Sequence, residues 1–402
     1  MYIKADNDNA LRHTDRNAPY AFFIEFTQLL HRGEDSETLC AVLYIQKKPR
    51  RGGSRKMIKK MCVLLVLMLT CALYCAAAED GKVKIDKEHF PDDIFRETVM
   101  EYDLDKDGIL SAEEAEKVTV LNVNDQGLIS LQGIEYLTGL KELSCCRNGL
   151  NTLYVGRNTK LEALACAENK LAALDVSNNT ELKILNCSNN HRFAALDLSR
   201  NPKLEQLYCG QNKLTELDLS RNTELKELDC GDNRLTELEL SQNTKLEILR
   251  CEWNEMKELD VSRNTCLEDL NCGDNEITDL NIRSLSGLKH LDVSGCKIKT
   301  LDLTECPELE TLFCAECGLT ELDVKGNPQL RVLRCDGNQL APLDISKCSK
   351  LAEMLEDTES YMGYAAGRPI QMWTKQQEQE GSTVQILLVA DAGLVPYTGS
   401  GK

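Results

Sequence analysis

The sequence is poor in aromatic residues, which make up 5% of its 402 residues, although apolar residues as a whole reach 42%. Its core must therefore consist of aliphatic and small side chains, chiefly leucine. Basic residues are outnumbered, 47 against 65 acidic ones, giving a net charge of −18. This balance argues against nucleic-acid binding, which needs clustered Lys and Arg. No apolar run reaches the roughly 18 residues of a membrane span, so we expect no transmembrane helix in the mature chain.

The common catalytic signatures are also missing. No H-E-x-x-H, G-x-S-x-G or phosphate-cradling glycine loop occurs in the sequence. His89, His191 and His290 are scattered, without a nucleophile beside them in the sequence. We therefore predict that the chain is not an enzyme. A pair of carboxylates acting on a carbohydrate stays open as an alternative, because acidic residues are plentiful.

Residues 57–78 have the pattern of a secretion signal. Lys59 and Lys60 form a basic start, an apolar stretch runs from Cys62 to Tyr74, and small alanines precede an acidic segment. We predict cleavage after Ala78 and a secreted or cell-surface protein. Residues 1–56 precede this signal and show no periodicity, so we interpret them as a non-native or untranslated leader.

Leucine recurs every 21 residues, with one interval of 22, through most of the chain. The positions are Leu140, Leu161, Leu182, Leu204, Leu225, Leu246, Leu267, Leu288, Leu309, Leu330 and Leu351. The skeleton is L-x-x-L-x-C-x-x-N-x-L-x-x-L-x-L-S-x-N-T-x, and about eleven units cover residues 118–351. The longer unit has its extra residue near His191, which we interpret as a tolerated insertion. Repeats of this length stack, because each unit buries its apolar edge only against its neighbours.

Within one unit, a segment such as Leu228-Asp229-Cys230 alternates apolar and polar residues. It reads as a short strand with Leu228 and Cys230 buried and Asp229 outside. The repeat resembles the leucine-rich repeat, most closely the short repeats of secreted bacterial proteins such as the internalins. That resemblance implies a solenoid horseshoe with a parallel β-sheet face and a convex side of turns and extended chain. A small α-helical cap over residues 79–117 and a β-hairpin-like cap and tail over 352–402 would close its ends.

Two columns of asparagine accompany the repeat. The first follows each strand, where the chain turns inward: Asn148, Asn169, Asn190, Asn212, Asn233, Asn254, Asn275 and Asn338. The second lies on the convex side: Asn158, Asn179, Asn201, Asn222, Asn243, Asn264 and Asn327. We expect their amides to bond backbone groups that no strand reaches.

The cysteines follow the repeat as well. One inward strand position is held by Cys145, Cys166, Cys187, Cys209, Cys230, Cys251, Cys272, Cys314 and Cys335, with Val293 in the remaining unit. Stacked strands hold such side chains about 4.8 Å apart with parallel directions, which suits free thiols and not disulfides or zinc. Only Cys296 and Cys317, in adjacent units, could pair. Cys146 faces outward and is the expected reactive thiol.

One segment before the first repeat matches the pattern D-x-[DN]-x-[DN]-G-x5-E at every position and looks like an EF-hand calcium loop. The predicted Ca²⁺ ligands are Asp103, Asp105, Asp107, the carbonyl of Ile109, Ser111 directly or through water, and Glu114. Gly108 permits the sharp turn. A helical cap that only looks like an EF-hand is the alternative.

The flanks of this loop are expected to be helical. Pro91-Asp92-Asp93 opens a helix whose Ile94, Phe95 and Val99 can face the first repeat. A short exit helix should run from Ala112 to about Lys117, before a strand that begins at Val118. At the other end, strands near 370–374 and at 384–389 suit a closing hairpin.

The outward strand positions are free to vary without harming the core, so we take them as a candidate binding face. The predicted residues are Tyr208, Asp229, Arg250, Trp253, Asn271, Asp292, Phe313 and Arg334. Aromatic and arginine side chains are typical of protein-binding patches. We therefore predict a secreted, calcium-binding, non-catalytic protein that binds a host or bacterial protein. A structural surface protein without a specific ligand is the alternative.

Overall fold

A computed structural model describes residues 81–341, 343–351, 371–373 and 384–385. All of these belong to one compact unit, which spans residues 77–402. The predicted leader and secretion signal lie outside the described residues. Within the described part of the chain, no helix is long and apolar enough to cross a membrane.

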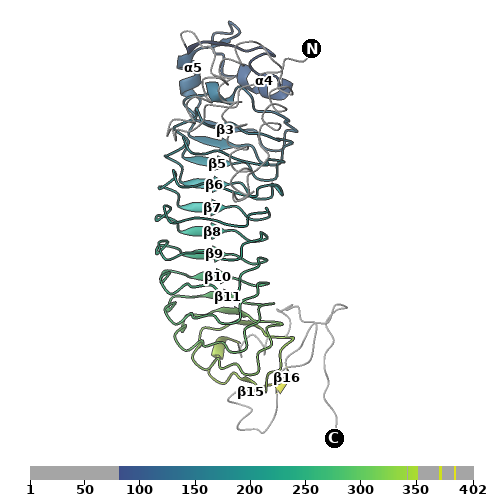
Figure 1. Cartoon of the computed structure of the whole chain (residues 1–402), viewed down its shortest axis with the longest axis vertical. Coiled ribbons are helices and arrows are strands. Elements are labelled where there is room, and N and C mark those ends of the chain that lie inside the picture. The colour runs from purple at the N-terminus through teal and green to yellow at the C-terminus, as the bar shows by residue number, and fades with distance from the viewer. Residues whose placement is uncertain (1–80, 342, 352–370, 374–383, 386–402) are drawn as a thin grey trace, which may run out of the picture. The chain divides into compact units, whose positions relative to one another are not determined.

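Two short helices and a two-stranded sheet form the N-terminal cap (Figure 1). β1 (Val83–Lys84) pairs antiparallel with β2 (Ile109–Leu110), and helices α4 (Asp93–Met100) and α5 (Ala112–Lys117) lie before and after β2. α5 has the predicted bounds. The first repeat strand begins at Val120 and not at Val118, because Val118 ends α5 as its C-cap.

Asp92 joins this cap to the repeats. Its Oδ1 accepts from Ile94 N and Phe95 N, which caps α4. Its Oδ2 accepts from Ile129 N at 2.9 Å, in the first repeat unit. α4 buries Phe95 and Val99 as expected, but Ile94 is 42% exposed. The prediction for Ile94 was wrong, because the buried side of this short helix takes only the two positions that are four residues apart.

The repeats form one parallel sheet of 11 strands in sequence order. Each strand has three residues: β3 (Val120–Asn122), β4 (Glu142–Ser144), β5 (Ala163–Ala165), β6 (Ile184–Asn186), β7 (Gln206–Tyr208), β8 (Glu227–Asp229), β9 (Ile248–Arg250), β10 (Asp269–Asn271), β11 (His290–Asp292), β12 (Thr311–Phe313) and β13 (Val332–Arg334). Successive strands pair in register, residue for residue, so that Leu228 lies opposite Leu249. The leucine-rich repeat fold is thereby confirmed.

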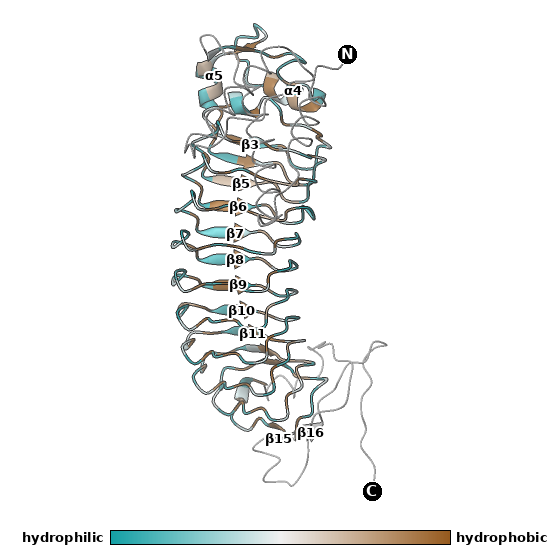
Figure 2. Ribbon diagram, in the orientation of Figure 1, coloured by the Kyte–Doolittle hydropathy of each residue, from teal (hydrophilic) through white to brown (hydrophobic). Residues whose placement is uncertain are grey.

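Hydrophobic and hydrophilic residues are mixed along every turn of the solenoid (Figure 2), and the leucines of the repeat form the core. The central strand residue is buried, as with Leu228 and Leu249, and the residues on both sides of it face out. The only described helix between β3 and β13 is a 3-10 turn, η2 (Ile134–Tyr136). Elsewhere the convex side consists of turns and extended chain, as predicted for so short a unit.

Both asparagine columns satisfy buried backbone groups. Asn169 is typical of the first column: its Nδ2 donates to the carbonyl of Cys145 at 2.9 Å in the preceding turn, and its Oδ1 accepts from Leu150 N at 3.1 Å. In the second column, Asn222 is fully buried and donates to the carbonyls of Leu198 at 3.2 Å and Asn201 at 2.9 Å. The amides therefore link neighbouring turns where no strand does.

The cysteine ladder is confirmed. Its members are 0% to 4% exposed, and Val293 fills the remaining turn at 0%. All described cysteines are free, including Cys296 and Cys317, the one pair that the sequence left open. The sulfur of Cys296 donates to the carbonyl of Cys272 at 3.3 Å, and that of Cys317 to the carbonyl of Val293 at 3.1 Å. The two thiols thus take over the bond that asparagine makes in the other turns.

The C-terminal end carries a small second sheet. β14 (Leu343–Asp344) pairs parallel with β15 (Gln371–Trp373), which pairs antiparallel with β16 (Val384–Gln385). The two strands predicted after the last repeat are present, and they pair as the expected hairpin would.

Candidate functional site

The acidic loop between α4 and α5 is folded around its own carboxylates. One oxygen each of Asp103, Asp105 and Glu114 lies within 4.8 Å of the others. Gly108, with φ of 79°, turns the chain so that its N–H donates to Asp103 Oδ2 at 2.8 Å. The backbone at this glycine is left-handed, a conformation that a side chain would strain. Three of the four carboxylates predicted as Ca²⁺ ligands are therefore brought together.

The fourth carboxylate is turned to the backbone. Asp107 Oδ1 accepts from Ile109 N at 2.8 Å, and Asp107 is not part of the cluster. Ile109 pairs with Lys84 in the β1–β2 sheet. Ser111 caps α5, with its hydroxyl donating to Glu114 Oε2 at 2.6 Å and accepting from Glu114 N at 3.3 Å. In this conformation Asp107 bonds the backbone of the loop, Ile109 pairs with β1, and Ser111 bonds Glu114.

Hydrogen bonds set the charge of the cluster. The Ser111 hydroxyl, then the N–H groups of Ser111 and Leu104, lower the pKa of Glu114 to about 2. For Asp105, the N–H of Asp107 acts to lower the pKa, but burial and the neighbouring carboxylates outweigh it, and the pKa is raised. The cluster thus presents concentrated negative charge, as a hard divalent cation requires.

The second candidate site is the sheet face, which we define as the outward residues of β3–β13 and of the rim loops that follow them. Every predicted face residue lies there. Tyr208, Asp229, Arg250, Asn271, Asp292 and Phe313 are half-buried strand residues, and Arg334 and Trp253 are exposed. Trp253 belongs to the rim loop after β9 and is 62% exposed.

Charge is unevenly distributed over this face. Between β8 and the loop after β11 it carries seven carboxylates, which we call the acidic stretch: Glu227, Asp229, Asp232, Glu252, Asp269, Asp274 and Asp292. Arg250 lies among them and forms ion pairs with Glu227 at 3.5 Å and Asp269 at 3.0 Å. Within the described residues, no other lysine or arginine forms an ion pair with this stretch. Sequence reasoning named two of its carboxylates and missed the rest, because they lie in different columns of the repeat.

Asp229 and Glu252, two carboxyls of the acidic stretch, have raised pKa values. Burial, then the charge of Glu227, raises the pKa of Asp229 against the opposing pull of Arg250 and a bond from Gly231 N. Burial and the nearby carboxylates Asp229 and Asp292 raise the pKa of Glu252. The pKa values of both acids are raised chiefly because burial disfavours the charged form, and the neighbouring carboxylates add to this effect.

The aromatic residues of the face lie apart. Tyr208 is on β7, beside Glu227, and burial together with a hydrogen bond to Glu227 raises the pKa of its hydroxyl to about 12. Phe313 is on β12, opposite Asp292 of β11 and Arg334 of β13. The structure therefore does not bring Tyr208 and Phe313 together, as expected from strands five turns apart.

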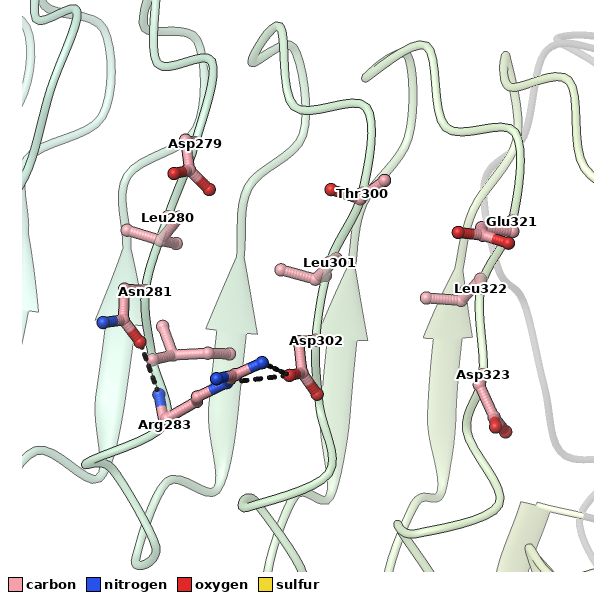
Figure 3. A pocket seen from close by; sticks show the side chains of 11 residues that line it. Asp279, Leu280, Asn281, Arg283, Thr300, Leu301, Asp302, Glu321, Leu322 and Asp323 are labelled. Carbon is pink, nitrogen blue, oxygen red and sulfur yellow. Dashed lines mark hydrogen bonds and ion pairs between the residues drawn. The ribbon is translucent and has the colours of Figure 1, made fainter.

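A trough of about 640 Å³ lies on another side of the solenoid, along the extended segments after the strand turns (Figure 3). Asp302 projects into it and is fully engaged. It accepts from Thr304 N at 3.1 Å and Thr304 Oγ1 at 2.7 Å, and from Arg283 Nε at 2.9 Å. The Thr304 bonds, then Arg283, lower the pKa of Asp302 to about 2. A carboxyl of this kind holds no proton near neutral pH and cannot act as a general acid.

The exposed thiol is not the one predicted. Cys146 is half-buried, whereas Cys266 is exposed. Cys266 occupies a column that holds Lys245 and Glu224 in the two preceding turns, where they form an ion pair. Sequence reasoning passed over it because Cys266 stands outside both cysteine columns.

Comparisons with known proteins agree with this fold. No protein-family model matches the chain, and no curated protein matches it. Among solved structures, the functional domain of InlJ from Listeria monocytogenes, which includes a cysteine ladder, is 30% identical. The match covers 67% of this chain and 74% of InlJ, with a TM-score of 0.44. The internalin InlF from the same species is 23% identical over 66% of this chain and 95% of InlF, with a TM-score of 0.49.

A more distant structure supports the fold alone. A TDR receptor is 16% identical, with a TM-score of 0.51 and coverage of 65% of this chain and 53% of the receptor. The family assignment is carried by the 21-residue repeat, by the parallel sheet that it forms, and by the identity to InlJ. The chain therefore belongs to the leucine-rich repeat proteins and resembles the internalins of Listeria.

Proposed function

We propose that this chain is a secreted, non-catalytic binding protein that presents its sheet face to a protein ligand. The observation that supports the proposal is that inward and outward residues of each strand have different roles. The central residue and the cysteine or valine after the strand build the core, while the flanking strand residues face out. Large outward side chains such as Tyr208 and Phe313 contribute nothing to that core. Their presence is typical of a surface that binds.

Capture experiments followed by substitution would test this proposal. The chain is used as bait for host and bacterial lysates, with and without calcium, and the captured protein is then titrated against variants. Alanine at Tyr208, Trp253, Phe313 or Arg334 should each cost about 2 kcal/mol of binding if the residue is a hot spot. Stability should change by no more than about 0.5 kcal/mol, as for other surface positions.

Arg250→Ala belongs to the same series but needs a stability measurement of its own, because it leaves Glu227 and Asp269 without their partner. Arg221→Ala and Arg263→Ala are the controls. Both side chains are exposed on the convex side, and their removal should leave binding unchanged. If only these two variants lost affinity, the ligand would bind the convex side and not the sheet face, which would refute the proposal.

We infer that the loop between α4 and α5 binds Ca²⁺. The donors suit this ion, because hard cations prefer carboxylate and carbonyl oxygens. Asp103, Asp105 and Glu114 already converge, and Gly108 holds the turn. Asp107, Ile109 and Ser111 would complete the coordination. With one such loop among the described residues, we expect affinity in the roughly 10⁻⁴ to 10⁻³ M range of extracellular modules.

Calorimetry at millimolar Ca²⁺ tests this inference, and Asp105→Asn is the variant to use. Asp105 is exposed and accepts a hydrogen bond from Asp107 N at 3.2 Å, which an asparagine oxygen can also accept. Glu114→Ala is less informative because it also removes the capping box of α5. An isotherm without heat for the wild-type chain would mean that the loop is only a cap.

A further inference from the structure

We propose that the sheet face over β8–β11, with the rim loops that follow β8, β9 and β10, binds an extended lysine- or arginine-rich segment of a protein partner. The inference rests on the proposed binding function and adds the partner's chemistry and the place where it docks.

The charge on this area is not neutralised from within. Arg250 forms ion pairs with Glu227 and Asp269, the first residues of the neighbouring strands β8 and β10. Five carboxylates of the acidic stretch remain without an ion pair among the described residues: Asp229, Asp232, Glu252, Asp274 and Asp292. Glu252 Oε2 is buried and has no hydrogen-bond partner in the described structure. An acceptor in that state is costly unless a donor arrives.

The excess of negative charge is confined to this area. Directly before the strands, acids form ion pairs with bases in neighbouring turns, as in Glu205 with Lys226 at 2.7 Å and Glu268 with Lys289 at 2.7 Å. From β3 to β6 the sheet face carries three carboxylates, Asp125, Glu142 and Glu168, and Glu168 is paired with Arg147. From β12 to β13 it carries two, Glu316 and Asp336, and Asp336 is paired with Arg334 at 3.2 Å. Charge complementarity therefore favours a cationic partner at the β8–β11 area, where seven carboxylates share one arginine.

Glycines make room for these carboxylates to lie along the sheet. A β-carbon on Gly231 would lie 2.9 Å from Glu252 Oε1, and one on Gly210 would lie 2.9 Å from Asp229 Oδ1. In the loops after β3–β6 the same position holds Asn124, Cys146, Ala167 and Ser188. The acids thus lie in fixed positions against the backbone, which reduces the entropy lost when a partner binds them.

Trp253 provides an apolar and π surface at the edge of the same area. It is 62% exposed and has φ of 55°, in a position where the adjacent loops carry Asp232 and Asp274. Polar residues or glycine hold the corresponding positions in the other loops, since a bulky side chain suits this conformation poorly. An indole exposed between two carboxylates is well placed for the stem of a lysine or the guanidinium of an arginine.

The dimensions suit a short extended peptide. Four neighbouring strands span about 14 Å, at roughly 4.8 Å per spacing. An extended chain covers that length in about four residues, with every second side chain facing the sheet. Two basic side chains four residues apart, about 13.4 Å, can therefore reach the carboxylates of β8 and β11 together, and a third between them would lie near the loop that carries Trp253.

Tryptophan fluorescence of the full chain tests the proposal. The sequence has two tryptophans, so Trp373→Phe leaves Trp253 as the only reporter. A short peptide of alternating lysine and serine should change its emission saturably, and added salt should weaken the binding. The same peptide with glutamate in place of lysine should leave the emission unchanged.

Charge-removing variants of equal size locate the site. Asp229→Asn, Glu252→Gln and Asp292→Asn combined should weaken binding of the lysine peptide at least about 10-fold. The matched control combines Glu237→Gln, Glu258→Gln and Glu321→Gln, which removes the same charge from exposed residues of the extended segments. Binding to the control should change less than about twofold. Trp253→Ala, measured by calorimetry, should cost about threefold.

Several outcomes would overturn the inference. Equal losses from both triple variants would show attraction to net charge alone. Equal affinity for the glutamate peptide would remove the charge argument. Spermidine binding as tightly as the lysine peptide would indicate a small-cation site and not a docking face. A natural partner that maps to Tyr208 and Phe313 while the lysine peptide fails would refute only this inference; a partner that maps off the sheet face would refute the proposed function too.

Discussion

Raising the pH above neutrality should unfold this protein through its buried thiols. Burial raises the pKa of Cys187 and Cys335 to about 12. The pKa values of the other ladder thiols are raised too, for Cys272 first by its hydrogen bond with Cys296 and for the rest by burial. In the unfolded chain a cysteine titrates near pH 8.5. Between these values the native state holds protons that the unfolded state has lost. Stability is therefore complete below about pH 8.5 and falls as the pH rises toward 12.

The size of the effect follows from linkage. Between pH 7.5 and 9.5, each thiol that stays protonated only in the native state should cost about 1.4 kcal/mol. Nine ladder positions together amount to about 12 kcal/mol, comparable with the whole stability of an ordinary domain of about 5–15 kcal/mol. The solenoid should accordingly lose most of its resistance to denaturant over this interval.

Denaturant titration under reducing, anaerobic conditions at several pH values measures this slope. The matched control is the triple variant Cys187→Val, Cys209→Val and Cys230→Val. Valine fits the position, since Val293 fills it at 0% exposure. The variant should lose about 4 kcal/mol less than the wild type between pH 7.5 and 9.5. Equal slopes for the two proteins, or a native thiolate absorbance near pH 8.5 that is lost in the triple variant, would refute the reasoning.

Three further outcomes are expected. Thiol labelling of the native chain should modify Cys266 first and Cys146 more slowly, with the other described cysteines reacting only after denaturation; early labelling of a ladder cysteine would contradict their burial. Asn222→Ala leaves two buried carbonyls without their donor and should cost about 3 kcal/mol in thermal or chemical unfolding. Asn222→Cys should cost less, since Cys306 donates in that column. Saturating Ca²⁺ at about 100 times its dissociation constant should stabilise the native state by about 2.7 kcal/mol, and Asp105→Asn should show a clearly smaller shift in melting temperature.

Much of this molecule could be predicted because its repeat has a constant period. When residues 21 apart occupy equivalent places, a column in the sequence becomes a column in space. Leu228 facing Leu249, the buried thiols and the two asparagine columns all follow from that identity. The calcium-loop pattern was likewise local, because its donors lie within one turn of chain.

Only the tertiary structure decided which side chains meet between columns. Cys296 and Cys317 replace asparagine as donors to carbonyls 24 residues earlier, a contact that depends on side-chain direction and not on spacing. Glu252 lies over Gly231 and close to Asp229 because neighbouring turns bring three different sequence positions together. All three aspartates of the loop accept bonds from its backbone, but only Asp103 and Asp105 also converge with Glu114, because the fold of the short loop fixes the direction of each side chain. Periodicity therefore determined the scaffold, whereas the surface chemistry depended on how adjacent turns pack, which no single repeat unit contains.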